Sequence, residues 1–448
     1  MSAKVGLDPE RVTELADSAA VQLAALGGIQ SELERTHSAS LNPLHFGFGP
    51  GSLIIAQISD WIARSAGADL AAASAAGSTL LRSLAAQVRE QQDASAGSAA
   101  AGSMTPARAR ELYNKVLADP TLLEDYTPEQ VAAFWAALEN DPAKQQALID
   151  ASPIVIGNLS GIPFDVRVKA NVLNAQETLK DPNITPAMRK YLERVVDPDA
   201  EKPVKLVTFD PANERIVEMV GEITDDTTTV ITYVPGTTSN MDTFYGGGVQ
   251  QVSAYLVEDD PNAVAFVYKD GLFPGGSSGS LAQGIPEAND HDYAIEAGKT
   301  LANFEDDVNR EPQLANATSV AIGHSWGLSN VTSSEVAGAH YDKVISLAGA
   351  WMPKEWEASP TTTYSSHTYA DWLYLAQETG GVGDGEYPRS STDFDRTFYD
   401  GPNEEISEVL GVKYPNPDVM ISNHNLISTR SDDNTDVLLD VAEEIFGD

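Results

Sequence analysis

The chain has 448 residues, with 66 acidic against 28 basic side chains and a formal net charge of −38. This charge repels phosphate backbones and anionic membrane surfaces, so we expect no nucleic-acid partner. The sequence has no cysteine, which excludes disulfides, zinc–thiolate sites and a cysteine nucleophile. No apolar run is long enough to span a bilayer, and nothing in the sequence calls for a metal or an organic cofactor.

The first 103 residues predict a helical hairpin followed by a linker. Apolar residues recur at helical spacing over residues 8–36 and 53–91, with Gly and Pro between the two stretches. Residues 93–103 are rich in Ala, Ser and Gly, as linkers are. The hairpin suits a structural bundle or a module for a protein partner. Because the N-terminus lacks the pattern of a signal peptide, we expect a cytoplasmic protein or one exported by another route.

Residues 104–200 predict a helical connecting region. Thr105, Thr127 and Thr185 each precede a proline. A threonine cap followed by proline at the first helical position is a helix-start signal. We therefore expect helices to begin at these three places.

Residues 201–448 predict an α/β catalytic domain. Short apolar runs at 204–209, 215–220, 229–234, 264–268, 319–322, 344–347 and 361–365 are typical of strands buried on both faces. Helical patterns near 294–308, 328–337 and 436–446 separate or follow them. This alternation favours a mostly parallel sheet flanked by helices. The acidic run Glu305-Asp306-Asp307 predicts a solvated helix face.

The motif Gly323-His324-Ser325-Trp326-Gly327 stands between the strand 319–322 and a helical segment. Strand, tight turn and helix form the setting of the nucleophile elbow in α/β-hydrolases. The alternative, a glycine-bounded turn of a nucleotide-binding fold, lacks the phosphate-binding lysine and the G-x-G-x-x-G pattern. We therefore take Ser325 as the candidate nucleophile.

A serine nucleophile needs a base, and in this fold the acid and the histidine follow it in that order. The histidines after Ser325 are His340, His367 and His424. His424 is the last of them and precedes the final helical pattern, in a segment we interpret as a polar loop. His424 is the candidate base. His324 is expected to pack beside the elbow.

The acid should follow the second strand after the elbow. Asp371 follows the strand predicted at 361–365 and is the candidate, with Asp384 and Asp393 as rivals. Its task is to orient the imidazole and stabilise the imidazolium.

An oxyanion hole needs two converging N–H groups. Trp326, directly after the nucleophile, is expected to supply one. The loop after the strand 229–234 is expected to supply the other, from Thr237 or Thr238, with Thr237 preferred.

Three further features carry weaker signals. The glycine-rich segment 273–279 has no lysine, so it predicts a loop or flap and not a phosphate cradle. Asp290-His291-Asp292 resembles a cluster of metal ligands, but we expect no metal there. Residues 378–417 suit an insertion that covers the substrate.

Specific motifs also precede the catalytic domain. They are TPEQVAAFW at residues 127–135, IGNLSGIP at 156–163, Val166-Arg167 and Ala170-Asn171. Together with Val234-Pro235-Gly236-Thr237 and the elbow, they resemble an actinobacterial α/β-hydrolase family with a helical N-terminal region. The resemblance covers roughly Pro128 to the C-terminus. It implies a hydrolase with Asp371 and His424 as acid and base. The chain departs from the family in having Trp326 where tyrosine is frequent, and Trp372 where proline is.

The sequence thus predicts a serine hydrolase that acts on a small-molecule or lipid carboxylic ester through Ser325, His424 and Asp371. Two alternatives start from the N-terminal hairpin, which is similar in outline to the helical hairpins of type VII secretion. One is an exported effector, and the other is a non-enzymatic interaction protein. The hairpin turn has Phe46-Gly47-Phe48-Gly49 in place of Trp-x-Gly.

Overall fold

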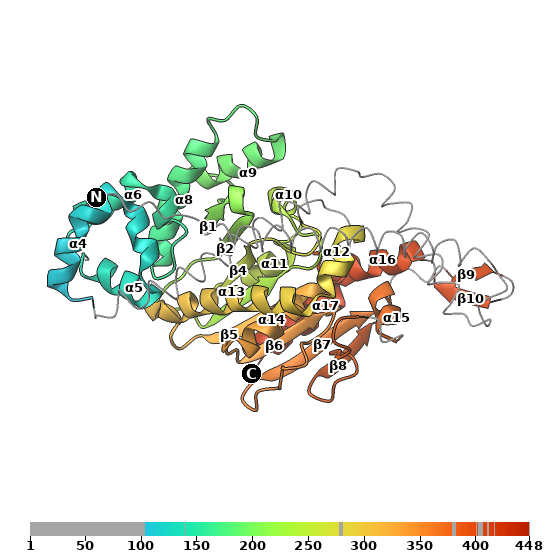
Figure 1. Cartoon of the computed structure of the whole chain (residues 1–448). Helices are drawn as coiled ribbons and strands as arrows, with labels where there is room; N and C mark the ends of the chain where they lie inside the picture. The colour runs from blue at the N-terminus through green and yellow to red at the C-terminus, as the bar shows by residue number, and fades with distance from the viewer. Residues whose placement is uncertain are drawn as a thin grey trace, which may run out of the picture. The chain divides into compact units, whose positions relative to one another are not determined.

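The computed structural model describes residues 104–447, apart from residues 139, 277–280, 379–381, 400, 402–405, 410–411 and 416. The predicted hairpin and linker, residues 1–103, lie outside the described residues. The described residues of 104–407 and 415–447 belong to one compact unit (Figure 1). Within the described part of the chain, no helix is both long and apolar enough to cross a membrane.

Six helices precede the first strand of the described chain. They are α4 (Pro106–Ala118), α5 (Pro128–Ala136), α6 (Pro142–Ala151), α7 (Pro153–Ile156), α8 (Phe164–Thr178) and α9 (Pro186–Val196). The predicted caps at Thr105, Thr127 and Thr185 are confirmed, since each side chain accepts a backbone N–H from the first turn of α4, α5 or α9. Most of these helices share a small apolar core of their own around Phe134 and Trp135.

An eight-stranded sheet forms the centre of the α/β region, in the order β1-β2-β4-β3-β5-β6-β7-β8. From β4 onwards in this order, neighbouring strands are parallel. Strand β2 runs antiparallel to both β1 and β4. The strands are β1 (Lys205–Asp210), β2 (Arg215–Val220), β3 (Thr229–Val234), β4 (Ala263–Asp270), β5 (Thr318–His324), β6 (Lys343–Leu347), β7 (Thr363–Tyr369) and β8 (Asp395–Tyr399). The predicted α/β-hydrolase fold, a mostly parallel sheet flanked by helices, is confirmed.

Each face of the sheet has its own apolar layer. Successive strand residues such as Val230 and Ile231 alternate between two buried clusters, as the twofold period of a strand requires. Helices α13 (His291–Arg310) and α14 (Trp326–Val336) complete one cluster; α9, α11 (Gln251–Asp259) and α17 (Thr435–Phe446) complete the other. The other helices of this part of the chain are α10 (Met241–Tyr245), α12 (Leu281–Ala288), α15 (Trp372–Glu378) and α16 (Pro417–Leu426).

The C-terminal part of the sheet differs from its prediction. The strand expected at residues 361–365 is β7 and begins and ends later, at Thr363–Tyr369. The segment interpreted as a covering insertion also supplies β8, which pairs with β7 at the edge of the sheet. Its sequence DRTFY is mostly exposed, so it lacks the apolar run that marks the central strands. Two further strands, β9 (Ile406–Val409) and β10 (Val412–Pro415), form a separate two-stranded sheet.

The motif at residues 156–163 attaches the helical region to the edge strand β1. The Asn158 side chain donates to the Phe209 carbonyl (3.0 Å) and accepts the Phe209 N–H (2.6 Å). The Asn171 amide donates to the Leu206 carbonyl (3.0 Å). These side chains satisfy backbone groups that an edge strand otherwise leaves open. Two asparagines of the family-like motifs therefore have a structural role.

A buried ion pair joins the same region to α13. Arg167 Nη1 lies 3.0 Å from Asp307 Oδ2, and Arg167 Nη2 donates to Thr208 Oγ1 (2.7 Å). The other Asp307 oxygen accepts the Gly161 N–H (3.0 Å) and also pairs with Arg310. Both side chains are buried, with 2% of Arg167 and 4% of Asp307 exposed. The prediction of a solvated acidic face at 305–307 is therefore wrong for Asp307, which the helical region covers, and for Glu305, which is also buried; only Asp306 is exposed.

Replacing Asp307 with asparagine is expected to lower the free energy of unfolding by about 3–5 kcal/mol, because the Arg167 charge then stays buried without its counter-ion. The midpoint of urea unfolding measures this change. Asp165→Asn is the matched control, since the Asp165–Lys169 pair is mostly exposed and contributes little. Equal midpoints for the two variants would contradict the structural role of the buried pair.

Candidate active site

Ser325 occupies the sharp turn between β5 and α14. Its backbone has φ 54° and ψ −123°, a strained conformation that non-glycine residues rarely adopt. The turn needs a glycine two residues later, since a Cβ on Gly327 would lie 2.0 Å from the Val234 carbonyl oxygen. Strand, strained serine and helix match the predicted elbow in geometry.

The structure brings His424 and Asp371 to Ser325. His424 Nε2 lies 2.9 Å from Ser325 Oγ, and His424 Nδ1 lies 2.5 Å from Asp371 Oδ2. All three residues are buried, with 7%, 5% and 1% exposed for Ser325, His424 and Asp371. With the Nδ1 proton bonded to the carboxylate, Nε2 is left to accept the hydroxyl proton of serine.

His424 lies on a helix, so the prediction of a polar loop is wrong. The segment Ser422-Asn423-His424-Asn425 contains weak helix formers, yet it belongs to α16. Buried Met420 and Ile427 anchor this segment, and the Asn423 amide donates to the Ala370 carbonyl (3.0 Å). Tertiary contacts thus override local propensity, and Asn423 ties the base to the segment just before the acid.

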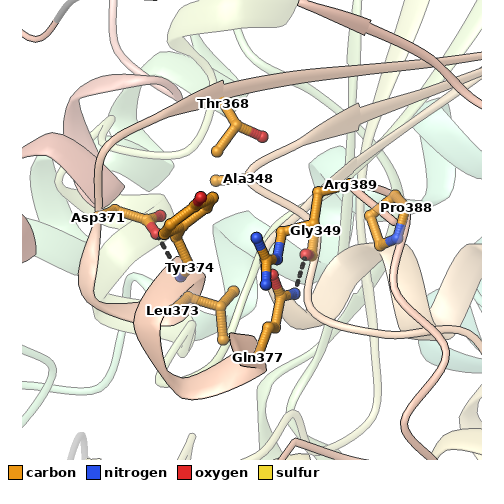
Figure 2. Close-up of a pocket in the computed structure, with 9 residues that line it drawn as sticks. All are labelled: Ala348, Gly349, Thr368, Asp371, Leu373, Tyr374, Gln377, Pro388 and Arg389. Atoms are coloured by element: carbon orange, nitrogen blue, oxygen red, sulfur yellow. Dashed lines mark hydrogen bonds between the residues drawn. The ribbon is translucent and has the colours of Figure 1, made fainter. Parts of the chain in front are cut away.

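Asp371 is also fixed by its own helix. Its second carboxylate oxygen accepts the Tyr374 N–H at 2.7 Å, in the first turn of α15 (Figure 2). The same figure shows Gln377, whose amide donates to the Gly349 carbonyl (3.0 Å). These residues line a depression that contains Asp371 but neither Ser325 nor His424. The depression therefore lies beside the residues that hold Asp371 in place, and it does not reach Ser325 or His424.

Neither rival carboxylate contacts the base. Asp384 accepts from His291 Nδ1 at 2.6 Å, and exposed Asp393 bonds to Ser391. Of the other histidines, His367 bonds to Tyr399 and Glu444, and His340 is exposed.

His291 belongs to the only group in the described ranges that has the composition of a metal site. Its ligand atoms and those of Glu355 and Asp384 lie within 4.8 Å of one another. The two ring nitrogens already face the two carboxylates, at 2.6 and 3.5 Å. Contacts between the imidazole and the two carboxylates therefore account for the cluster. Neighbouring Asp290 caps α13 by accepting the Tyr293 N–H, which gives it a structural role.

The loop after β3 lies directly against Ser325. A Cβ on Gly236 would lie 2.8 Å from Ser325 Cβ. The Thr238 N–H is used elsewhere, since it donates to the Pro274 carbonyl at 2.7 Å. Among the described residues, no acceptor bonds the N–H of Thr237 or of Trp326. These two groups are therefore the ones available to an oxyanion, whereas Thr238 is not.

Trp326 presents only its backbone to this site. Its indole is fully buried and packs edge-on against Phe273 and Tyr293. Phe273 begins the glycine-rich segment. In the described part of this segment, the Gly275 N–H donates to the Glu287 carboxylate (2.7 Å). The bulky residue after the nucleophile thus holds the start of α14 in place.

Comparison with known proteins gives only distant likenesses. No family model matches the chain, and no curated protein matches its sequence. Among solved structures, the dienelactone hydrolase-like promiscuous phosphotriesterase P91 from metagenomic libraries is 13% identical, with a TM-score of 0.33; the match covers 55% of this chain and 98% of that one. TT1662 from Thermus thermophilus is 9% identical over 44% of this chain and 89% of its own, with a TM-score of 0.28.

These TM-scores are too low to carry an argument, so the fold assignment depends on the strand order and the elbow. The resemblance to the actinobacterial family stays a prediction. The chain has an α/β-hydrolase fold that presents a buried serine, histidine and aspartate in contact.

Proposed function

We propose that the protein is a serine hydrolase that cleaves carboxylic esters. The observation that supports it is the contact chain from Ser325 Oγ through His424 to Asp371, with distances of 2.9 and 2.5 Å. A serine hydroxyl becomes an effective nucleophile when a positioned base accepts its proton. In this proposal Ser325 is the nucleophile, His424 the base and Asp371 the group that orients it.

The reaction begins when Ser325 Oγ attacks the ester carbonyl carbon and His424 Nε2 takes the hydroxyl proton. The carbonyl oxygen becomes an oxyanion, which accepts hydrogen bonds from the N–H groups of Thr237 and Trp326. His424 then gives its proton to the leaving alcohol, and an acyl-serine remains. Water attacks this acyl group with His424 again as base, and collapse releases the acid and restores Ser325.

Turnover of p-nitrophenyl acetate, butyrate and octanoate tests this function. We expect the protein to hydrolyse at least the short-chain esters, and to cleave the matching p-nitroanilides more slowly because the amine is a poorer leaving group. A triglyceride emulsion in the same assay separates a lipid substrate from a small ester. A folded protein that hydrolyses none of these esters would contradict the proposal.

The two alternatives, an exported effector and a non-enzymatic interaction protein, depend on residues 1–103. Nothing in the described residues favours either of them over the hydrolase.

A further inference from the structure

His324 ends β5 directly before the nucleophile, and its side chain turns towards the base. His324 Nε2 lies 3.1 Å from the main-chain carbonyl oxygen of His424. A carbonyl only accepts hydrogen bonds, so Nε2 carries the proton and donates it. The imidazole rings of the two histidines are 5.2 Å apart between centroids. One histidine therefore holds the backbone of the other.

The His424 carbonyl needs this donor because it lies at the end of a helix. Helix α16 ends at Leu426, and the last four carbonyls of a helix have no partner within it. The next N–H groups go to other acceptors: Ser428 donates to Asn425 (3.3 Å) and Thr429 to Leu426 (2.9 Å). Among the described residues, no other donor bonds the His424 carbonyl. His324 thus caps the last turn of α16.

The charge state of His324 suits this position. Burial, together with the neighbouring charge of His424, lowers the pKa of His324 to about 3. His324 is therefore neutral at neutral pH. A neutral donor holds the carbonyl without placing a second positive charge beside the imidazolium that forms on His424. A protonated side chain there would oppose the proton transfer from serine.

A small displacement of His424 would weaken catalysis, because its two ring nitrogens must bond partners on opposite sides of the ring. His424 must keep Nδ1 on Asp371 and Nε2 on Ser325 at the same time. Catalytic groups need to stay within a fraction of an ångström of the productive geometry. The Trp372 ring, 5.4 Å from the His424 ring between centroids, packs against the side chain but leaves the carbonyl free. Among the described residues, the bond from His324 is the one that holds the His424 carbonyl.

We propose that His324 is a positioning residue for the hydrolase reaction, holding the last turn of α16 so that His424 stays aligned between Asp371 and Ser325. This inference rests on the proposed function. It goes beyond that function by giving a role to a side chain that touches neither substrate nor the reacting atoms.

The test compares three replacements of His324. His324→Gln keeps an amide N–H at a similar reach, whereas His324→Asn is too short to reach and His324→Leu has no donor. We expect the Asn and Leu variants to lose about 10- to 100-fold in kcat, as misplaced catalytic groups do, with KM changed less than about threefold. The Gln variant is expected to retain kcat within about threefold of the wild type. His340→Leu, at an exposed histidine, is the matched control and should leave kcat and KM unchanged.

A spectroscopic readout makes the test independent of turnover. The Nδ1 proton shared by His424 and Asp371 is expected to give a low-field proton NMR resonance in the resting protein. We expect this resonance in the wild type and the Gln variant, and its broadening or loss in the Asn and Leu variants, while circular dichroism stays unchanged. If the wild type hydrolyses no ester, the proposed function fails but the resonance still reports the positioning. Asn and Leu variants with wild-type kcat and an intact resonance would overturn the inference, as would a Gln variant that is no better than Leu.

Discussion

Replacing Ser325 with alanine is expected to lower kcat/KM for ester hydrolysis by about 10⁴-fold or more, because alanine has no hydroxyl to form the acyl intermediate. The Ser325 side chain is small and its removal leaves the backbone of the turn in place. Folding should therefore be retained, which circular dichroism and the urea midpoint check. The measurement is steady-state hydrolysis of a p-nitrophenyl ester by purified wild type and variant.

Ser329→Ala is the matched control for this prediction. Ser329 is also buried on α14, where its hydroxyl donates to the Trp351 carbonyl (2.8 Å). Its loss should cost stability through one hydrogen bond and leave kcat/KM within a few-fold of wild type. Activity that survives in Ser325→Ala and disappears in Ser329→Ala would place the nucleophile elsewhere.

Replacing Asp371 with asparagine is expected to lower kcat by about 10³- to 10⁴-fold. An amide can donate a hydrogen bond to His424 Nδ1, which would leave the proton on Nε2, and that tautomer cannot accept the proton of serine. The Asn side chain is nearly the same size, so substrate binding and KM should change little. Single-turnover and steady-state assays on the same ester measure the effect.

The two rival carboxylates provide the controls. Asp384→Asn and Asp393→Asn should keep kcat within a few-fold of wild type, since Asp384 faces His291 and Asp393 is exposed. If one of these variants lost activity as strongly as Asp371→Asn, the assignment of the acid would be wrong.

The sheet and the order of the site residues could be predicted because both follow from local pattern. Buried parallel strands read as apolar runs, and β2 and β3 begin and end where the sequence placed them. The edge strand β8 was missed because an exposed strand has no such run. The placement of His424 in a loop failed for a related reason. Its local composition opposes a helix, and only packing of Met420 and Ile427 stabilises one.

Features that depend on contacts between distant segments could not be predicted. The sequence offers Thr237 and Thr238 side by side and supplies no contact on which to base the preference for Thr237. The bond from the Thr238 N–H to the Pro274 carbonyl leaves the Thr237 N–H as the available one. Similarly, nothing local distinguishes Asp307 from a surface carboxylate. Its burial follows from Arg167, which lies 140 residues away in the chain.

A motif in the helical connecting region has a structural role. This motif, at residues 156–163, is a specific part of the predicted family resemblance, yet its Asn158 bonds to the edge strand β1 and not to the candidate active site. A specific motif in this chain therefore marks a packing requirement between the helices and the sheet.

Covalent labelling tests the central claim most directly, namely that Ser325 is the nucleophile activated by His424. The protein is treated with a fluorophosphonate probe, digested and analysed by peptide mass spectrometry, with Ser325→Ala and His424→Ala treated alongside. We predict one adduct, on the peptide that contains Ser325, with labelling abolished in Ser325→Ala and strongly slowed in His424→Ala. An unlabelled Ser325 in folded protein, or an adduct that persists in Ser325→Ala, would contradict the account.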